Sequence, residues 1–288
     1  MDTPTAKITA SKFARWSKPF RKAFDRTPAV STTRRVPDGK RVYCVGDIHG
    51  RDDLLREVAE WVEADLKSRS LDQAVTVFLG DYIDRGADSK RVLERLATGE
   101  WPTSIIALVG NHEEFLLAFL DDAEILDFWR GQGGLETLHS YGVDVGPAMA
   151  GRDFKEVQEK FTAHLPKNHR SFLEGLNVSV VFGDYFFCHA GVRPGVALDR
   201  QDRDDLLNIR EPFLSSEAEH GKLVVHGHTP TMAPEIRPNR IGIDTAAYAT
   251  GRLTCLILEK DEQHFLPLGG HDVQQDIESH DGSLSISS

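Results

Sequence analysis

Cysteine is scarce in this sequence, with three residues among 288. Cys44, Cys188 and Cys255 each lie inside an apolar run, and no two of them are closely spaced. A disulfide framework requires paired cysteines in a secreted protein, and a thiolate zinc site requires cysteines a few residues apart. We therefore expect three buried thiols in a reducing compartment, which predicts a cytoplasmic protein.

Long apolar runs and positive charge are also in short supply. No stretch approaches the roughly 20 apolar residues of a membrane-spanning helix, and no secretory signal pattern opens the chain. The formal net charge is −11. Residues 1–41 hold eleven Lys and Arg against three Asp, about +8, so the rest carries about −19. An acidic body argues against nucleic acid as a ligand, because binding to phosphate backbones uses a basic face.

Residues 1–39 are predicted to be a basic extension. Within residues 8–24, aromatic side chains recur three or four positions apart with basic residues between them, which is the pattern of an amphipathic helix. These aromatic residues are Phe13, Trp16, Phe20 and Phe24. Two interpretations stay open: the segment contacts an anionic membrane or a partner, or it packs on its own domain.

The main domain is predicted at residues 40–268, where strand and helix patterns alternate. The predicted strands are residues 41–45, 74–79 and 104–109, and the predicted helices between them are residues 53–68 and 89–97. This βαβαβ order predicts a mainly parallel core with functional loops at the carboxyl ends of its strands.

The second half of the chain follows a different pattern. Residues 114–176 are predicted to be mostly helical. Shorter strands are predicted at residues 178–182, 185–188, 223–225, 241–243 and 253–259. Residues 269–288 are polar and Ser-rich, a composition typical of disorder.

Polar motifs follow the first three predicted strands directly. They are GDIHG at residues 46–50, GDYIDRG at 80–86 and GNHE at 110–113. Each begins with Gly, which lets the backbone turn sharply and present a polar side chain at the edge of the sheet. One such turn alone could be an ordinary helix cap. Three in succession indicate a functional site.

Two later turns, HAG at residues 189–191 and HGHT at 226–229, place His at the ends of apolar strands as well. Carboxylate, imidazole and amide oxygen are ligands suited to Mn²⁺, Fe or Zn²⁺. Two metals roughly 3.5–4 Å apart need a bridging carboxylate and form a clamp for displacement at phosphorus. Asp81, from the middle of the first three motifs, is the natural bridge.

These five motifs, in this order, resemble the phosphoprotein phosphatase family of calcineurin-like metallophosphoesterases. The resemblance covers about residues 42–258, and the Asp84-Arg85-Gly86 part of GDYIDRG is what marks this branch. It implies an α/β (α+β) fold, a four-layer α-β-β-α sandwich with a helical cap inserted at about residues 114–176. The branch includes protein phosphatases and dinucleoside tetraphosphate hydrolases.

The resemblance also implies roles for individual residues. His112 would be the general acid, oriented by Asp84, and Arg85 and Arg210 would bind the phosphoryl oxygens together with Asn111. His226 would have no such role. The implied metal ligands are Asp47 and His49 for one ion, Asp81 as the bridge, and Asn111, His189 and His228 for the other.

The expected function is a two-metal phosphomonoesterase of the bacterial protein phosphatase type, acting on Ser/Thr and also Tyr phosphates with two divalent ions. Manganese is the expected metal, with iron or zinc as alternatives. Two features support this type: the eukaryotic Ser-Ala-Pro-Asn-Tyr loop is missing, and Thr229-Pro230 follows His228. Asn208, where bacterial members often carry Trp, weakens the assignment of Arg210.

The alternative is a nucleotide polyphosphate hydrolase, such as one acting on dinucleoside tetraphosphates. An inactive phosphate-binding scaffold is disfavoured, because no ligand or acid position has been lost. The expected partner is therefore a phosphorylated protein or a small phosphate ester. Aromatic and aliphatic residues in the predicted cap are interpreted as its core rather than as substrate contacts, namely Phe128, Trp129, Leu135, Leu138 and Tyr141.

Overall fold

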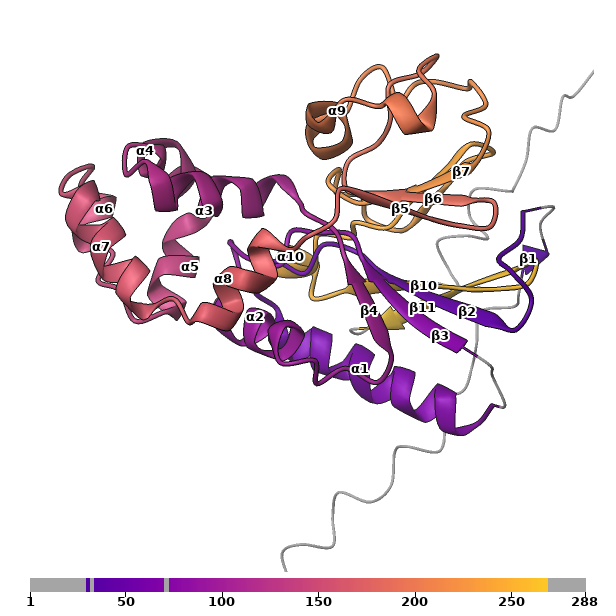
Figure 1. Cartoon of the computed structure of the whole chain (residues 1–288), viewed down its shortest axis with the longest axis horizontal. Coiled ribbons are helices and arrows are strands. Elements are labelled where there is room, and N and C mark those ends of the chain that lie inside the picture. Colours follow the sequence, from indigo (N-terminus) through magenta and orange to yellow (C-terminus); the bar gives the residue numbers. More distant parts are fainter. Residues whose placement is uncertain (1–29, 32–33, 70–72, 269–288) are drawn as a thin grey trace, which may run out of the picture.

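Two β-sheets packed face to face form the centre of the molecule in the computed structural model, which describes residues 30–31, 34–69 and 73–268 (Figure 1). The first sheet has six strands in the order β1-β11-β10-β2-β3-β4. The second has five, in the order β5-β6-β7-β9-β8. This arrangement confirms the predicted sandwich.

The first sheet is mixed. Its strands are β1 (Val30–Ser31), β2 (Lys40–Val45), β3 (Gln73–Phe78), β4 (Ser104–Ala107), β10 (Leu253–Glu259) and β11 (Glu262–Leu268). The three strands predicted to be parallel are parallel, with Val45 opposite Phe78 and Phe78 opposite Ala107. Their carboxyl ends therefore lie side by side, and the polar turns that follow them start at one edge. Strands β10 and β11 complete the sheet in antiparallel pairing.

The second sheet carries the later motifs. Its strands are β5 (Ser179–Phe182), β6 (Tyr185–Cys188), β7 (Leu223–His226), β8 (Glu235–Ile236) and β9 (Arg240–Gly242). Strands β6, β7 and β9 run parallel. His189 follows β6 directly and His228 comes two residues after the end of β7, so both lie at the carboxyl ends of strands, as the Asp residues of the first sheet do.

The helices lie along the first sheet, in a cap and in shorter segments near the second sheet and the strand ends; the label η marks a 3₁₀-helix (Figure 1). Helices α1 (Asp52–Lys67) and α2 (Ser89–Ala97) lie along the outer face of the first sheet. The others are α3 (Asn111–Asp121), α4 (Ile125–Trp129), η1 (Arg130–Gln132), α5 (Gly134–Ser140), α6 (Gly146–Met149), α7 (Phe154–His164), α8 (Lys167–Glu174), η2 (Leu198–Arg200), α9 (Arg203–Asn208) and α10 (Ala247–Thr250). We call α3 to α8 the helical cap, and it projects from one end of the sandwich.

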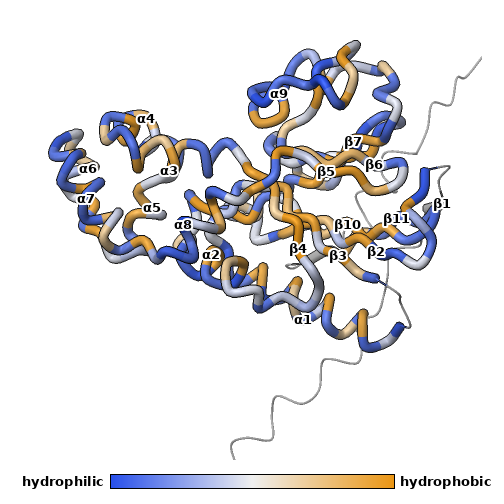
Figure 2. Tube along the Cα trace, in the orientation of Figure 1, coloured by the Kyte–Doolittle hydropathy of each residue, from blue (hydrophilic) through white to orange (hydrophobic). Residues whose placement is uncertain are grey.

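Successive side chains of each strand point to opposite faces of the sheet, and this alternation separates the two apolar layers. Tyr43 and Val45 of β2 pack against the helices, whereas Val42 and Cys44 face the second sheet. In the second sheet, Phe187 faces inward and Phe186 packs under the segment containing α9. Fully burying an apolar side chain of this size stabilises the fold by about 1.5–3 kcal/mol relative to leaving it exposed. Figure 2 shows the apolar strands inside and polar residues along the outer helices.

The folded body begins before residue 40, where we placed its boundary. Val36 is buried between the sheets, and its backbone N–H donates to Lys260 O at 2.9 Å. Asp184 N–H donates to Arg35 O at 2.8 Å, and β1 pairs with β11. The predicted amphipathic helix and the predicted disordered tail lie outside the described residues. Among the described helices, none combines the length and hydropathy needed to cross a membrane.

Candidate active site

Five residues in the motif turns adopt a left-handed backbone conformation, which residues other than Gly seldom adopt. His49, Asp81, Asp84, Arg85 and His228 have positive φ values of 45°, 51°, 73°, 66° and 63°. Such conformations cost on the order of 1–3 kcal/mol each and cluster at functional sites. The surrounding fold must hold these turns in place, and it does so by close packing of backbone against side chain.

Glycine is required where two motif turns touch. A Cβ atom at Gly110 would collide with the Asp81 carboxylate, and one at Gly227 would collide with the Asp47 carboxylate. The Gly that opens GNHE and the Gly inside HGHT therefore allow a neighbouring strand's carboxylate to approach the backbone.

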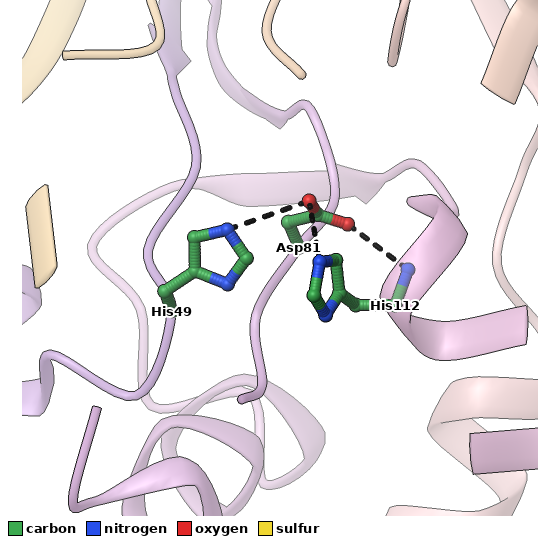
Figure 3. Close-up of side chains that lie close together, drawn as sticks. All are labelled: His49, Asp81 and His112. Carbon is green, nitrogen blue, oxygen red and sulfur yellow. Dashed lines mark hydrogen bonds and ion pairs between the residues drawn. The ribbon is translucent and has the colours of Figure 1, made fainter. Parts of the chain in front are cut away.

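Asp81 lies at the centre of the site, where rings from three different turns face its carboxylate. His49 Nε2 lies 3.5 Å and His112 Nε2 3.9 Å from Asp81 Oδ2, and His189 Nε2 lies 3.4 Å from Oδ1. Figure 3 shows the His49 and His112 rings beside this carboxylate. All four side chains are buried. Asp81 is therefore placed as a bridge between two groups of nitrogen ligands.

Asn111 and His228 complete the second group. Asn111 Oδ1 lies 3.0 Å from His189 Nε2 and 2.9 Å from His228 Nδ1. Asp47 joins from the first motif, since its Oδ2 accepts the His228 backbone N–H at 3.0 Å. The structure thus brings together all six predicted ligands: Asp47, His49, Asp81, Asn111, His189 and His228.

Backbone carbonyls fix the orientation of two of the rings. Nδ1 of His49 lies 2.8 Å from Ile83 O, and Nδ1 of His189 lies 2.9 Å from Leu79 O. Each Nδ1 must donate its proton there, which leaves Nε2 as a lone pair aimed at Asp81. Burial lowers the pKa of His49 to about 3 and lowers that of His189 as well. Both rings are therefore neutral, the form in which His binds a metal.

The arrangement of these potential ligand atoms suits metal ions. His189 Nε2, Asn111 Oδ1 and an Asp81 oxygen are mutually close acceptors without a proton to share. Asp47 Oδ1 is buried with no hydrogen-bond partner among the described residues. Burial, Asp244 and Asp81 together raise the pKa of Asp47 well above its usual range, because nearby carboxylates repel one another. Divalent ions would relieve both the acceptor contacts and the repulsion.

Among the described residues, two groups of side chains have the spacing of a metal site: His49, Asp81 and His112, and Asp81, His189 and His228. Asp81 belongs to both, as a bridging ligand would. His112 differs from the rest of the first group, because its Nδ1 is bound to Asp84 and its Nε2 lies 3.2 Å from Arg85 Nη2. A metal ion at His112 Nε2 would sit against a guanidinium, so Asp47 is the better partner for His49.

His112 and Asp84 form a buried pair. Nδ1 of His112 donates to Asp84 Oδ2 at 2.6 Å. Burial lowers the pKa of His112, but the Asp81 charge and the Asp84 hydrogen bond raise it more, to about 9 in the absence of metal. Because Nδ1 is held by Asp84, Nε2 is the ring atom that faces the site, and it is the atom from which the predicted acid would donate its proton.

Arg85 lies beside His112. The Arg85 guanidinium carbon is 4.9 Å from the centre of the Tyr248 ring, which supports it. Arg210 is exposed and follows α9. Burial and the nearby His189 lower the pKa of His228 most, and the charge of Arg210 adds to them. The role of Arg210 as a second phosphate-binding cation stays a prediction.

Several residues that support the site were not predicted from the sequence. Glu113, quoted in GNHE without a role, accepts the backbone N–H groups of Gly110, Asp81 and Tyr82 at 2.8–2.9 Å. It ties the second and third motif turns together. Asp244, which follows β9, adds a third buried carboxylate, and its "Ile-Asp" after an apolar strand was the available signal.

Two further contacts come from the cap. Trp129 Nε1 donates to Asp84 Oδ2 at 2.7 Å, and Thr137 Oγ1 donates to Asp84 Oδ1 at 2.6 Å. Trp129 is also part of the cap's core, as predicted, together with Leu138 and Tyr141. The prediction was wrong for Phe128, whose side chain is 57% exposed.

The structure agrees with the predictions for His226 and for the three cysteines. His226 is buried edge-on against Phe213, with ring centres 5.0 Å apart, and takes no part in the ligand groups. Cys44, Cys188 and Cys255 are free buried thiols. Burial raises the pKa of each thiol, which makes them poor nucleophiles and poor ligands.

A family profile described as calcineurin-like phosphoesterase matches residues 40–275. The chain belongs to this family and is a metal-dependent phosphoesterase. An asymmetrical bis(5'-nucleosyl)-tetraphosphatase PrpE of Oceanobacillus iheyensis is 22% identical over 232 residues, which cover 74% of this chain and 87% of that enzyme.

Two further comparisons extend the picture. The symmetrical bis(5'-nucleosyl)-tetraphosphatase of Paracidovorax citrulli is 39% identical over 77 residues, so the match spans 27% of this chain and only 25% of that enzyme. A crystal structure assigned as a diadenosine tetraphosphatase superposes with a TM-score of 0.54 and 19% identity, covering 84% of this chain and 97% of the other. At that identity the likeness shows the fold alone.

Proposed function

We propose that this chain is a dinucleoside tetraphosphate hydrolase, which cleaves a phosphoanhydride bond with water. The observation that carries the proposal is the relative from Oceanobacillus iheyensis, which has that named activity and aligns over 74% of this chain. It favours the alternative over the protein phosphatase that the motifs alone predicted. The protein phosphatase keeps one supporting feature, Thr229-Pro230 after His228.

The charges of the site suit a polyphosphate. When bound, two divalent ions would lower the pKa of a water and neutralise phosphoryl oxygens. The chain itself supplies Arg85, whose Nη2 lies 3.2 Å from His112 Nε2, so a phosphoryl oxygen held by the guanidinium lies next to the proton donor. Arg210 adds a second cation at the rim. Hydrolysis breaks one P–O bond, water adds to phosphorus, and the leaving nucleotide takes a proton from His112.

Product analysis tests the proposal directly. Purified protein is incubated with Mn²⁺ and diadenosine tetraphosphate, and the nucleotides are separated by anion-exchange chromatography. Symmetrical cleavage yields two ADP, and asymmetrical cleavage yields ATP and AMP. We expect one of these patterns, and none with Asp81→Asn. No nucleotide product from a preparation that hydrolyses p-nitrophenyl phosphate would reject the proposal.

A further inference from the structure

A row of five rings crosses the site. Tyr248 meets His49 at 5.3 Å between ring centres, His49 meets His112 at 4.7 Å, and His112 meets Phe115 at 5.8 Å. Phe128 extends the row beyond Phe115 at 5.1 Å. Every contact is edge-to-face, the geometry that aromatic pairs favour. The three inner rings flank the centre of the site, and the two outer rings carry no metal or acid function.

The two ends of the row are exposed. Tyr248 is 37% exposed and Phe128 57%, whereas His49 and His112 are buried and Phe115 is half-buried. Helix geometry fixes the cap end, because Phe115 is three residues after His112 on α3 and therefore shares its face. Phe128 comes from α4, which packs on α3 (Figure 1). The Phe128 ring thus packs on Phe115, the ring that contacts the candidate acid His112.

The surroundings of Phe128 are polar. Asp127 and Arg130 form an ion pair at 2.7 Å on the same short segment, with Asp127 exposed and Arg130 half-buried. A single exposed aromatic residue needs no explanation in general. Phe128, however, packs against Phe115, and Phe115 packs against His112. Contacts with residues of the site therefore set the orientation of the exposed face of Phe128.

We propose that Phe128, braced by Phe115, is a stacking platform for a nucleoside base of the substrate, an inference that rests on the proposed function. A dinucleoside polyphosphate has a base at each end, and the ring row has an exposed ring on each side of the ligand groups. The polyphosphate would lie over Asp81, and one base would stack on Phe128. Tyr248 is less suited to a stacking role because one of its faces supports Arg85.

Steady-state kinetics of Phe128→Ala test this platform against two substrates. Diadenosine tetraphosphate has bases, and p-nitrophenyl phosphate has a phenyl ester and no base. Loss of stacking on an aromatic side chain should raise KM for diadenosine tetraphosphate about tenfold with little change in kcat. Values for p-nitrophenyl phosphate should stay unchanged. Phe128→Trp, which keeps a stacking face, should restore KM.

A matched control is Ile236→Ala, because Ile236 is 50% exposed on β8 and outside the ring row. It should change neither substrate. An unchanged KM for diadenosine tetraphosphate in Phe128→Ala would overturn the platform, and so would equal losses on both substrates, which indicate a disturbed site. If the wild-type protein does not cleave diadenosine tetraphosphate at all, the proposed function fails first and the platform with it.

Discussion

Asp81 is the residue whose removal should have the largest effect at the scale of single side chains. Asp81→Asn keeps the shape and the oxygen that accepts the His112 backbone N–H, but removes the charge that both ligand groups share. We expect the variant to lose bound divalent metal and to fall to background turnover. Metal analysis after dialysis, together with assays in added Mn²⁺, measures both effects.

Folding of that variant should survive. Asn keeps the volume of Asp81 and the oxygen that accepts the His112 backbone N–H, so the far-UV circular dichroism of the variant should match that of the wild type. Full activity or full metal content in Asp81→Asn would contradict its assignment as the bridge.

The loss of rate on replacing His112 should be larger for a leaving group that needs a proton than for one that does not. His112→Asn removes the donor, and general acid catalysis is typically worth about 10²–10⁴-fold. The loss should be larger for a phosphoserine peptide than for p-nitrophenyl phosphate, since p-nitrophenolate leaves without protonation. Parallel rate measurements on the two esters, at saturating metal, give the comparison. Equal losses on both esters would contradict the role of His112 as the general acid.

The candidate site residues could be predicted because their motifs resemble those of a known family. The six candidate metal ligands, Asp84, His112 and Arg85 all lie in segments that follow strands, and parallel strands bring such segments to one edge. Trp129, Thr137 and Tyr248 could not be predicted. They reach the site from helices without any local signature, so only tertiary packing shows their contacts.

At the scale of elements, the cap holds the acid pair in place through Asp84. Trp129→Phe keeps the ring packing and deletes the hydrogen bond to Asp84 Oδ2. We expect a loss of about 1.5–3 kcal/mol in the free energy of unfolding, the usual worth of a bond to a charged group. Turnover of poor leaving groups should also slow, because Asp84 keeps its bond to Thr137 but holds the His112 ring less firmly.

Trp101→Phe provides the control. Trp101 Nε1 donates to Thr76 Oγ1 at 2.8 Å in the core, away from Asp84. This variant should lose stability in urea unfolding without a selective effect on poor leaving groups. If both variants slow all substrates equally, the cap's contact with Asp84 has no positioning role.

A buried ion pair joins α1 to β2. Arg41 Nη2 lies 2.9 Å from Asp65 Oδ2, and both side chains are 1% exposed. Burial alone would raise the pKa of Asp65, but the hydrogen bond from Tyr43 and the charges of Arg41 and Arg69 outweigh it and lower the pKa. Asp65→Asn leaves Arg41 with only Glu259 as its acidic partner and should cost about 3 kcal/mol at neutral pH.

The pH dependence of this pair has a definite sign. A depressed carboxyl pKa stabilises the fold above the unfolded value of about 3.9, and the contribution is lost as the pH falls through the folded value. Urea unfolding at pH 7 and at pH 3 should show the gap between wild type and Asp65→Asn narrowing at low pH. A constant gap would mean that the charge of Asp65 is not what stabilises the contact.

Three predicted elements have the bounds that the structure shows. The strands Tyr185–Cys188 and Leu253–Glu259 and the helix Ser89–Ala97 have the predicted bounds. The strands β8 and β11 were missed, since charged residues interrupt their sequences and pairing with a neighbour specifies them. Arg35 and Val36 likewise carry no strand or helix pattern, yet pack on the body.

The N-terminal region divides into two parts at the scale of the whole molecule. Deleting residues 1–29 should leave turnover of p-nitrophenyl phosphate unchanged, because every site residue described lies after Val45. Deleting residues 1–38 should lower the melting temperature, because it removes buried Val36 and the ion pair of Arg34 with Glu219. Thermal unfolding and assays of both truncated proteins test this boundary, and equal stability of the two would contradict it.

The proposed activity is the metal-dependent hydrolysis of dinucleoside polyphosphates. It can be tested by the ratio of kcat/KM for diadenosine tetraphosphate to kcat/KM for a phosphoserine peptide, measured on one Mn²⁺-loaded preparation. We expect a ratio well above one, with both activities lost on chelation of the metal. A ratio below one, with rapid release of phosphate from the peptide, would contradict it and assign the site to protein dephosphorylation.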